Sequence, residues 1–169
     1  MKKSCLLALL FCLFCLGWPS HPGARIIEGV PFFKQERHQC GAVALAAVFA
    51  YYDHTVSPHR ISRAVYNETL GGALLPDLEN YAAGRGFETE SGQGDLDLIK
   101  KSVLDRKPVI VLIDDGVWLA SRPHYIVVFG FNEKGVIVHD GTDPSVLMDY
   151  GTFEKRWRRL GNPYLIVHP

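Results

Sequence analysis

The segment from Cys40 to Tyr52 constrains the fold most, because it is apolar on nearly every side and rich in alanine. A helix with no polar face is a buried helix. Small side chains also allow such a helix to pack closely against a sheet. The segment therefore predicts a buried central helix with Cys40 on its first turn.

Cys40 is the cysteine that we expect in the folded body, because Cys5, Cys12 and Cys15 lie in an N-terminal apolar run. A thiol on the first turn of a helix is close to unpaired backbone N–H groups and to the positive end of the helix dipole. Both favour the reactive thiolate. The alternative is a buried structural cysteine, as many free cysteines are.

The N-terminus has the pattern of a secretory signal. It begins Met1-Lys-Lys and is then apolar from Cys5 to Leu16. A membrane span needs about 20 apolar residues, so this run is short for one. We expect a signal peptide at residues 1–24, with cleavage near Ser20 or Ala24, and an exported protein, periplasmic or secreted. No small residue precedes Cys12 or Cys15, so lipidation is less favoured, and membrane association is expected only if the N-terminus is retained or lipidated.

The charges of the mature chain are nearly balanced. Lys2 and Lys3 are the only charges before Arg25, and without them 16 basic and 18 acidic residues remain. Nucleic-acid binders usually carry a basic face, so this balance argues against a nucleic-acid partner. About 145 residues suffice for one domain with its own core. A lone cysteine cannot form an internal disulfide.

Helical patterns come first along the chain and strand patterns follow. Capping residues and apolar spacing predict further helices at 57–66, at 76–84 and from 95 onward. Apolar runs predict strands at 109–113, 124–131 and 135–140, followed by 146–150, a short helix with Phe153 and Trp157, and 164–168. This order is typical of an α+β domain with an antiparallel sheet.

A cysteine nucleophile needs a base, and His124 is the best placed of the seven histidines. It begins a strand directly after Ser121-Arg-Pro123, where a loop enters the sheet. The other six lie near the cleavage region, near Cys40, in a polar turn, in mid-strand or at the C-terminus: His21, His38, His54, His59, His139 and His168. His38 and Cys40 have no accompanying ligand cluster, so we expect no metal and no cofactor.

Asp140, at the end of the next strand, is the expected partner of His124. If residues 132–134 form a three-residue loop with Gly135 left-handed, Phe131 pairs with Gly135. His124 and Asp140 then share a face, whereas a two- or four-residue loop would separate them. Asp143 ranks second, because it lies beyond Gly141 and next to Pro144, in a predicted turn.

Gln35 and Gln39 are the candidates for an oxyanion donor, since a primary amide supplies N–H groups without titrating. Gln35 precedes Cys40 by five residues, which is far enough for the chain to loop back beside the thiol. Gln39 is adjacent to Cys40 and is expected to point away. Gln35 is therefore preferred.

These residues resemble the papain-like cysteine peptidases, and most of all the bacteriocin-processing peptidase family 39 and its stand-alone exported relatives. The resemblance rests on Pro31-Phe-Phe-Lys-Gln-Glu36, on Gln39-Cys-Gly41 with the alanine-rich helix, and on His124-Tyr-Ile-Val-Val with Asp140-Gly141. It implies a papain-like domain at residues 25–169, with the nucleophile helix packed on a C-terminal antiparallel sheet. In transporter-fused members the glutamine usually lies six residues before the cysteine, and Gln39 stands here where they have an acidic residue.

The resemblance implies Cys40 as nucleophile, His124 as base, Asp140 as its orienting partner and Gln35 as oxyanion donor. The expected function is hydrolysis of a peptide bond, in a peptide or protein substrate, through an acyl-enzyme. Two alternatives use the same cleft. One is a papain-fold acyltransferase or crosslinking enzyme, and the other is a non-catalytic peptide-binding or assembly module.

Overall fold

The computed structural model describes residues 23–117 and 120–169. Most of the expected signal peptide, residues 1–24, lies outside them. The helices are α1 (Cys40–Tyr51), α2 (Pro58–Val65), α3 (Leu75–Ala83), α4 (Leu96–Leu104) and α5 (Tyr150–Arg158). Within the described ranges, no helix has the length and apolar character needed to cross a membrane.

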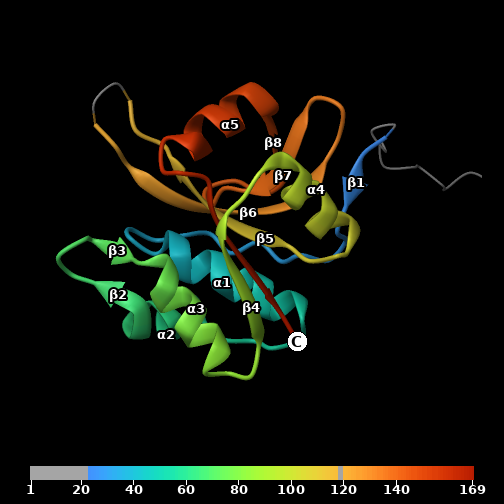
Figure 1. The fold of residues 1–169 in the computed structure, drawn as a ribbon. Helices are drawn as coiled ribbons and strands as arrows, with labels where there is room; N and C mark the ends of the chain where they lie inside the picture. The colour runs from blue at the N-terminus through green and yellow to red at the C-terminus, as the bar shows by residue number, and fades with distance from the viewer. Residues whose placement is uncertain (1–22, 118–119) are drawn as a thin grey trace, which may run out of the picture.

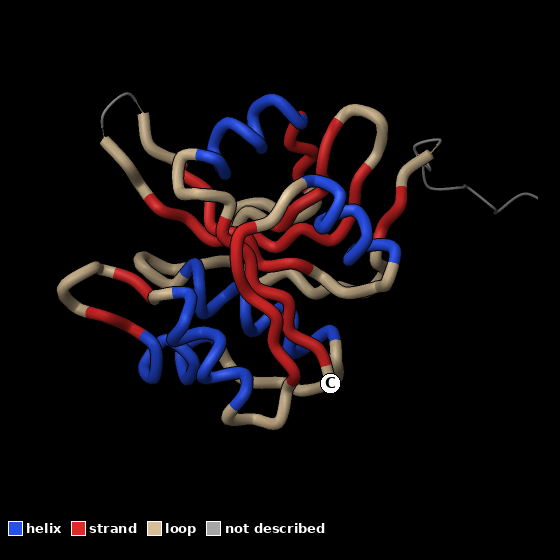
Figure 2. Tube along the Cα trace, in the orientation of Figure 1, coloured by secondary structure: helices blue, strands red, loops and turns tan. Residues whose placement is uncertain are grey.

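An antiparallel sheet divides the molecule into two halves (Figures 1 and 2). Its strands, in spatial order, are β4 (Glu88–Gln93), β9 (Pro163–His168), β5 (Val109–Asp114), β6 (Pro123–Phe131), β7 (Gly135–His139) and β8 (Val146–Asp149). A short strand, β1 (Arg25–Ile26), pairs with β6. A separate hairpin is formed by β2 (Tyr66–Asn67) and β3 (Gly72–Ala73). The architecture is the expected α+β fold, with the helix that carries Cys40 packed on an antiparallel sheet.

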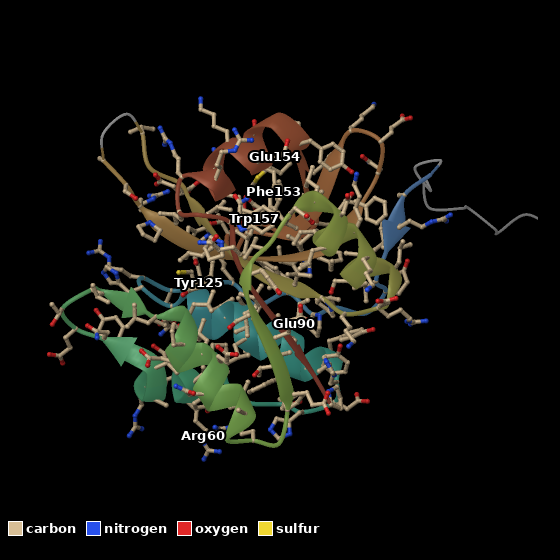
Figure 3. All side chains as sticks on the ribbon, in the orientation of Figure 1. Arg60, Glu90, Tyr125, Phe153, Glu154 and Trp157 are labelled. Atoms are coloured by element: carbon tan, nitrogen blue, oxygen red, sulfur yellow. The ribbon has the colours of Figure 1, made fainter. Side chains whose placement is uncertain are left out.

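Helices cover both faces of the sheet (Figure 1). The helices α1, α2 and α3 share one core cluster with the sheet, and nine consecutive residues of α1 are buried, as its apolar surface predicts. The residues Phe153 and Trp157 of α5 point toward the opposite face (Figure 3). Burial on both faces explains why β5, β6 and β7 are nearly continuous apolar runs.

Polar side chains cap three of the helices, and the sequence predicts two of these caps, at Ser57 and Asp95. The side chain of Ser57 accepts from the backbone N–H of Arg60 at the start of α2, where Pro58 is the first helical residue. Asp95 accepts from Leu98 at the start of α4, and Asp149 caps α5 in the same way. Each cap satisfies an N–H group that has no partner within its helix.

Strand β4 was not predicted from the sequence. Its six residues are polar or glycine, and five of them are exposed. The strand lies at the edge of the sheet and pairs with β9 alone. An edge strand with little buried surface has no apolar alternation to reveal it, so only the pairing with β9 defines it.

The turn of the β6–β7 hairpin differs from the one that the sequence led us to expect. Phe131 pairs with Val136 rather than with Gly135, and Gly135 is not left-handed. This one-residue offset alone would place His124 and Asp140 on opposite faces. A bulge between Val128 and Gly130 removes the offset, so that Val127 pairs with His139, as the expected register requires.

Gly135 is needed for a different reason than the predicted left-handed turn. A Cβ atom at this position would lie 2.1 Å from the carbonyl oxygen of Met148 on β8. The glycine therefore allows β7 and β8 to approach each other closely. The turn itself is closed by Asn132, whose side chain accepts from the backbone N–H groups of Lys134 and Gly135.

Candidate active site

An open cleft of ≈ 540 Å³ lies where β5 and β7 end and where β6 and α1 begin. Gln35, Cys40, His124 and Asp140 all line it. They come from three stretches that are distant in sequence, since Gln35 and Cys40 are five residues apart, and the fold brings all four residues together. Their proximity is a structural fact, and their chemical roles are considered below.

The first turn of α1 carries Cys40, and the close packing of Gly41 fixes its position. A Cβ atom on Gly41 would lie 3.0 Å from the ring of Tyr125 and 3.1 Å from Leu78. Because Gly41 has no side chain, the start of α1 packs closely against the ring of Tyr125, a residue of β6 (Figure 3). The hydroxyl of Tyr125 donates to the carbonyl of Ala73, which fixes the ring.

The environment of Cys40 favours the thiolate. Burial by itself raises the pKa of the Cys40 thiol, but the hydrogen bond and charge of His124, with backbone N–H groups of Tyr125 and Gly41, outweigh burial and lower it. These N–H groups include one from the first turn of α1, where helix donors have no internal partner. The thiol is partly buried rather than enclosed. The cleft therefore holds a partly buried thiol in surroundings that favour its thiolate form.

The tautomer of His124 is set by its contact with Asp140. Its Nε2–H donates to the backbone carbonyl of Asp140, at 2.6 Å. A carbonyl only accepts, so the proton must be on Nε2, and Nδ1 is left to face Cys40. The imidazole can then accept the thiol proton on Nδ1.

The pKa of His124 is raised. Burial would lower the pKa of the imidazole, but its hydrogen bonds with Cys40 and with the Asp140 carbonyl, and the negative charges of Cys40 and Asp115, raise it overall. The raised pKa of His124 and the lowered pKa of Cys40 have a common cause, because each group stabilises the charged form of the other. Both shifts favour the imidazolium–thiolate form of the pair over its neutral form.

Asp140 contacts His124 through its main chain, whereas the sequence led us to expect a contact through its carboxylate. Its Oδ1 atom accepts instead from the backbone N–H groups of Thr142 and Asp143, at 2.8 and 2.7 Å. An aspartate often closes a turn in this way. The carboxylate shapes the turn, and the turn presents the carbonyl to the imidazole. Asp143, the second choice from the sequence, is exposed within this turn.

Gln35 lies against the same turn. Its backbone N–H donates to the carbonyl of Gly141 at 2.8 Å. Gly141 is left-handed (φ 82°), and a Cβ atom there would lie 2.8 Å from Oε1 of Gln35. A glycine is therefore required both for the backbone conformation and for the closeness of the amide. Gln35 is half-buried on the wall of the cleft that carries Cys40.

Two residues of the site were missed in the sequence. Asp115 lines the cleft, and its charge helps to raise the pKa of His124. Its sequence context indicated only a turn after a strand. His139 was taken as a mid-strand residue, yet it is buried and bonded through both ring nitrogens. His38 lines the cleft but is exposed.

No metal centre accompanies these groups in the described part of the chain. Among residues 23–117 and 120–169, no three His, Cys, Asp or Glu side chains are grouped as a metal ion would require.

Three solved structures with the same fold are described as peptidases or peptidase domains. A C39-like peptidase from Bacillus anthracis matches with a TM-score of 0.71 at 16% identity, over 86% of this chain and 98% of its own. The peptidase domain of Streptococcus ComA, a bifunctional transporter of a quorum-sensing pathway, matches with 0.67 at 23%, over 83% and 98%. A double-glycine protease from an AMS/PCAT transporter, solved with its leader peptide, matches with 0.66 at 22%, over 83% and 91%. No curated protein matches the chain.

The fold and the thiol–imidazole pair define a papain-like cysteine peptidase. The family model of the peptidase C39 family matches residues 30–166, and the chain belongs to that family. The resemblance inferred from the sequence is thereby confirmed, and so are the fold class and the assignment as an enzyme.

Proposed function

We propose that this protein is an exported cysteine peptidase that hydrolyses a peptide bond through Cys40, His124 and Asp140, with Gln35 as oxyanion donor. The observation that carries the proposal is the arrangement in one cleft of the Cys40 thiol, the His124 imidazole that lowers its pKa, and the Asp140 carbonyl, 2.6 Å from Nε2 of His124. A nucleophile with an adjacent base, and a base held by a third group, is the arrangement that covalent catalysis requires.

The reaction proceeds in two halves. The Cys40 thiolate attacks the carbonyl carbon of the scissile bond, and the oxyanion that forms accepts hydrogen bonds from the Gln35 amide and a backbone N–H at the start of α1. The imidazolium of His124 donates its Nδ1 proton to the leaving amine as the C–N bond breaks. His124 then takes a proton from water, the water attacks the thioester, and the acid product leaves as the thiol is restored.

The proposed substrate is a peptide or protein segment that lies along the open cleft. The related protease from an AMS/PCAT transporter was solved with a leader peptide, which supports a peptide ligand for the same fold. Export rests on the N-terminal pattern of Met1-Lys-Lys and the apolar run that ends at Leu16. Mass analysis of the protein recovered from the periplasmic and culture fractions tests export. An intact N-terminus in a cytoplasmic fraction would contradict it.

Product masses test the reaction. The purified protein is incubated with peptide mixtures, with and without a primary amine such as glycine amide. Hydrolysis gives two fragments whose summed mass exceeds that of the substrate by one water, whether or not the amine is present. Amide products would instead identify an acyltransferase. Labelling of Cys40 by iodoacetamide at pH 6 tests the alternative of a peptide-binding module. A catalytic thiol should label rapidly at this pH, whereas the cysteine of a site that only binds peptides should label at the rate of an ordinary thiol.

Substitutions of Asp140 distinguish its main-chain role from a role of its charge. Asp140→Asn keeps an oxygen that can accept from Thr142 and Asp143, so the carbonyl stays in place and kcat/KM is expected to fall by about tenfold or less. Asp140→Ala removes this acceptor, and a loosened carbonyl is expected to cost on the order of a hundredfold.

Steady-state kinetics of both Asp140 variants check this order. A loss on the order of 10⁴-fold in Asp140→Asn, as when a charged orienting carboxylate is replaced, would contradict the main-chain role. Thr142→Ala is the matched control, because its backbone N–H, which donates to the carboxylate, is retained.

Gln35→Ala is expected to lower kcat by about a hundredfold to a thousandfold with little change in KM, since an oxyanion donor acts mainly in the transition state. The fast alkylation of Cys40 should persist, because the thiolate is stabilised by His124 and by backbone N–H groups. Gln39→Ala is the control, one residue from the thiol. Equal kinetics for Gln35→Ala and the wild type would remove Gln35 from the mechanism.

A further inference from the structure

His139 is a buried histidine outside the catalytic set, and both of its ring nitrogens are engaged. It is 7% exposed. Its Nε2 lies 3.0 Å from the carbonyl oxygen of Val30, and its Nδ1 accepts from the backbone N–H of Ser145 at 3.2 Å. A carbonyl only accepts and an amide N–H only donates. The ring is therefore neutral, with its proton on Nε2.

These two contacts join the segments that carry the catalytic groups. Val30 precedes the stretch that leads to Gln35, and Ser145 ends the turn that begins at Asp140. The same segments also meet directly, through the bond from Gln35 to Gly141. Ser145 is left-handed (φ 56°), a conformation that non-glycine residues rarely adopt, so the bond to His139 helps to hold it there.

We propose that His139 is a positioning residue for catalysis. Its neutral imidazole clamps residues 30–35 to residues 140–145 and thereby keeps the Asp140 carbonyl in place for His124. The inference rests on the proposed function of Cys40 and His124. Protonation of His139 would put an N–H on Nδ1 facing the N–H of Ser145, and this contact would be lost.

The surroundings of His139 favour the neutral form. Its ring packs against Phe32 and Phe129, with centroid separations of 5.4 and 4.3 Å. Two titratable side chains, Cys40 and Tyr125, line the same small, mainly apolar cavity, and Asp140 follows His139 in the chain. Burial lowers the pKa of His139, and it outweighs the opposing effects of the Val30 carbonyl and the Asp140 charge.

The direction of the pH effect follows from this lowered pKa. The unfolded chain binds a proton near pH 6.5, the ordinary value for histidine, whereas the folded chain resists until a lower pH. Stability from the neutral clamp is therefore complete above about pH 6.5. It is lost as the pH falls from there through the pKa of His139 in the fold. Acidification should loosen the Asp140 turn before the whole domain unfolds.

Three substitutions separate the two hydrogen bonds. His139→Asn places an oxygen near the position of Nδ1 and can still accept from Ser145, but it is too short to reach Val30. His139→Gln can still donate to Val30 and loses the acceptor for Ser145. His139→Phe keeps an aromatic ring against Phe32 and Phe129 and loses both bonds. None of these side chains titrates.

Catalysis and labelling give the first result. His139→Phe is expected to lose on the order of tenfold to a hundredfold in kcat/KM at neutral pH, and its Cys40 should label more slowly with iodoacetamide at pH 6. His139→Asn should restore most of both. In His139→Asn the fall of kcat/KM at acid pH should follow the binding of one proton. The wild-type fall should be steeper, because both His139 and the Cys40 pair titrate. Ile99→Val, in the core cluster on the opposite face of the sheet, is the control for a general loss of stability and should leave the pH profile unchanged.

Amide hydrogen exchange at Ser145 measures directly whether His139 holds the Ser145 N–H, independently of catalysis. Protection should be lost in His139→Phe and His139→Gln, and kept in His139→Asn. Wild-type exchange and an unaltered pH profile in His139→Phe would overturn the inference. If the wild type itself failed to label rapidly or to cleave peptides, the proposed function would fail instead, and the exchange data would still decide whether His139 holds the turn.

Discussion

Cys40→Ala is expected to fold like the wild type and to lose measurable peptidase activity, a fall on the order of 10⁴-fold or more. The sulfur is the atom that forms the covalent intermediate, and no other cysteine is present in the part of the chain that the structure describes. Cys40 is only partly buried, so its truncation leaves a small cavity, and the free energy of unfolding should change by about 1 kcal/mol or less. Peptide cleavage and thermal unfolding measure the two effects.

The same variant also tests the alternative of a structural cysteine. If Cys40→Ala lowered the free energy of unfolding by about 3 kcal/mol or more, as large core truncations do, a structural role would be favoured. Cys40→Ser is the companion variant, because it keeps a polar group beside His124 but offers a much weaker nucleophile. An inactive and stable Cys40→Ala protein can then be used to capture peptides from the exported fraction.

His124→Ala is expected to abolish turnover and also to remove the fast labelling of Cys40 at low pH. Without the imidazole, burial of the thiol is opposed only by backbone N–H groups, so the pKa of Cys40 rises. An ordinary thiol with a pKa of about 8.5 is less than about 1% thiolate at pH 6. The iodoacetamide rate at that pH should therefore fall by about a hundredfold or more.

The sign of this effect is fixed by the direction of the pKa shift. In the wild type the thiolate persists as the pH falls, until the lowered pKa of Cys40 is reached, and in His124→Ala it disappears at higher pH. His38→Ala is the matched control, because His38 also lines the cleft. Equal labelling profiles for His124→Ala and the wild type would show that the helix start alone activates the thiol.

Much of the fold can be predicted from local patterns. The apolar surface of Cys40–Tyr51 marks a buried helix, and the capping residues Ser57 and Asp95 mark helix starts. These signals are legible because each arises within a few residues of the chain, from burial or from an unpaired N–H group. The candidate site residues were selected in the same way, from residue type and position at the ends of predicted elements.

The details of the site depend on contacts between distant segments. The bulge between Val128 and Gly130 offsets an unexpected turn, and the glycine is its one local signal, which does not specify the register on either side. Asp140 was expected to use its carboxylate, yet two neighbouring N–H groups compete for that carboxylate and the carbonyl is presented instead. His139 gave no signal beyond its place in a strand, because its function as a clamp requires Val30, which is 109 residues away.

The sequence by itself determined the class of the protein, through the resemblance of its motifs to a known family. It also determined the candidate nucleophile and base, since a buried helix, a strand start and a free thiol are encoded locally. Only the tertiary structure decided which atom of Asp140 meets His124, how Gln35 approaches Gly141, and what His139 holds together. Hydrogen bonding is directional over about 3 Å. The backbone register that sets such distances is fixed by the packing of the whole sheet.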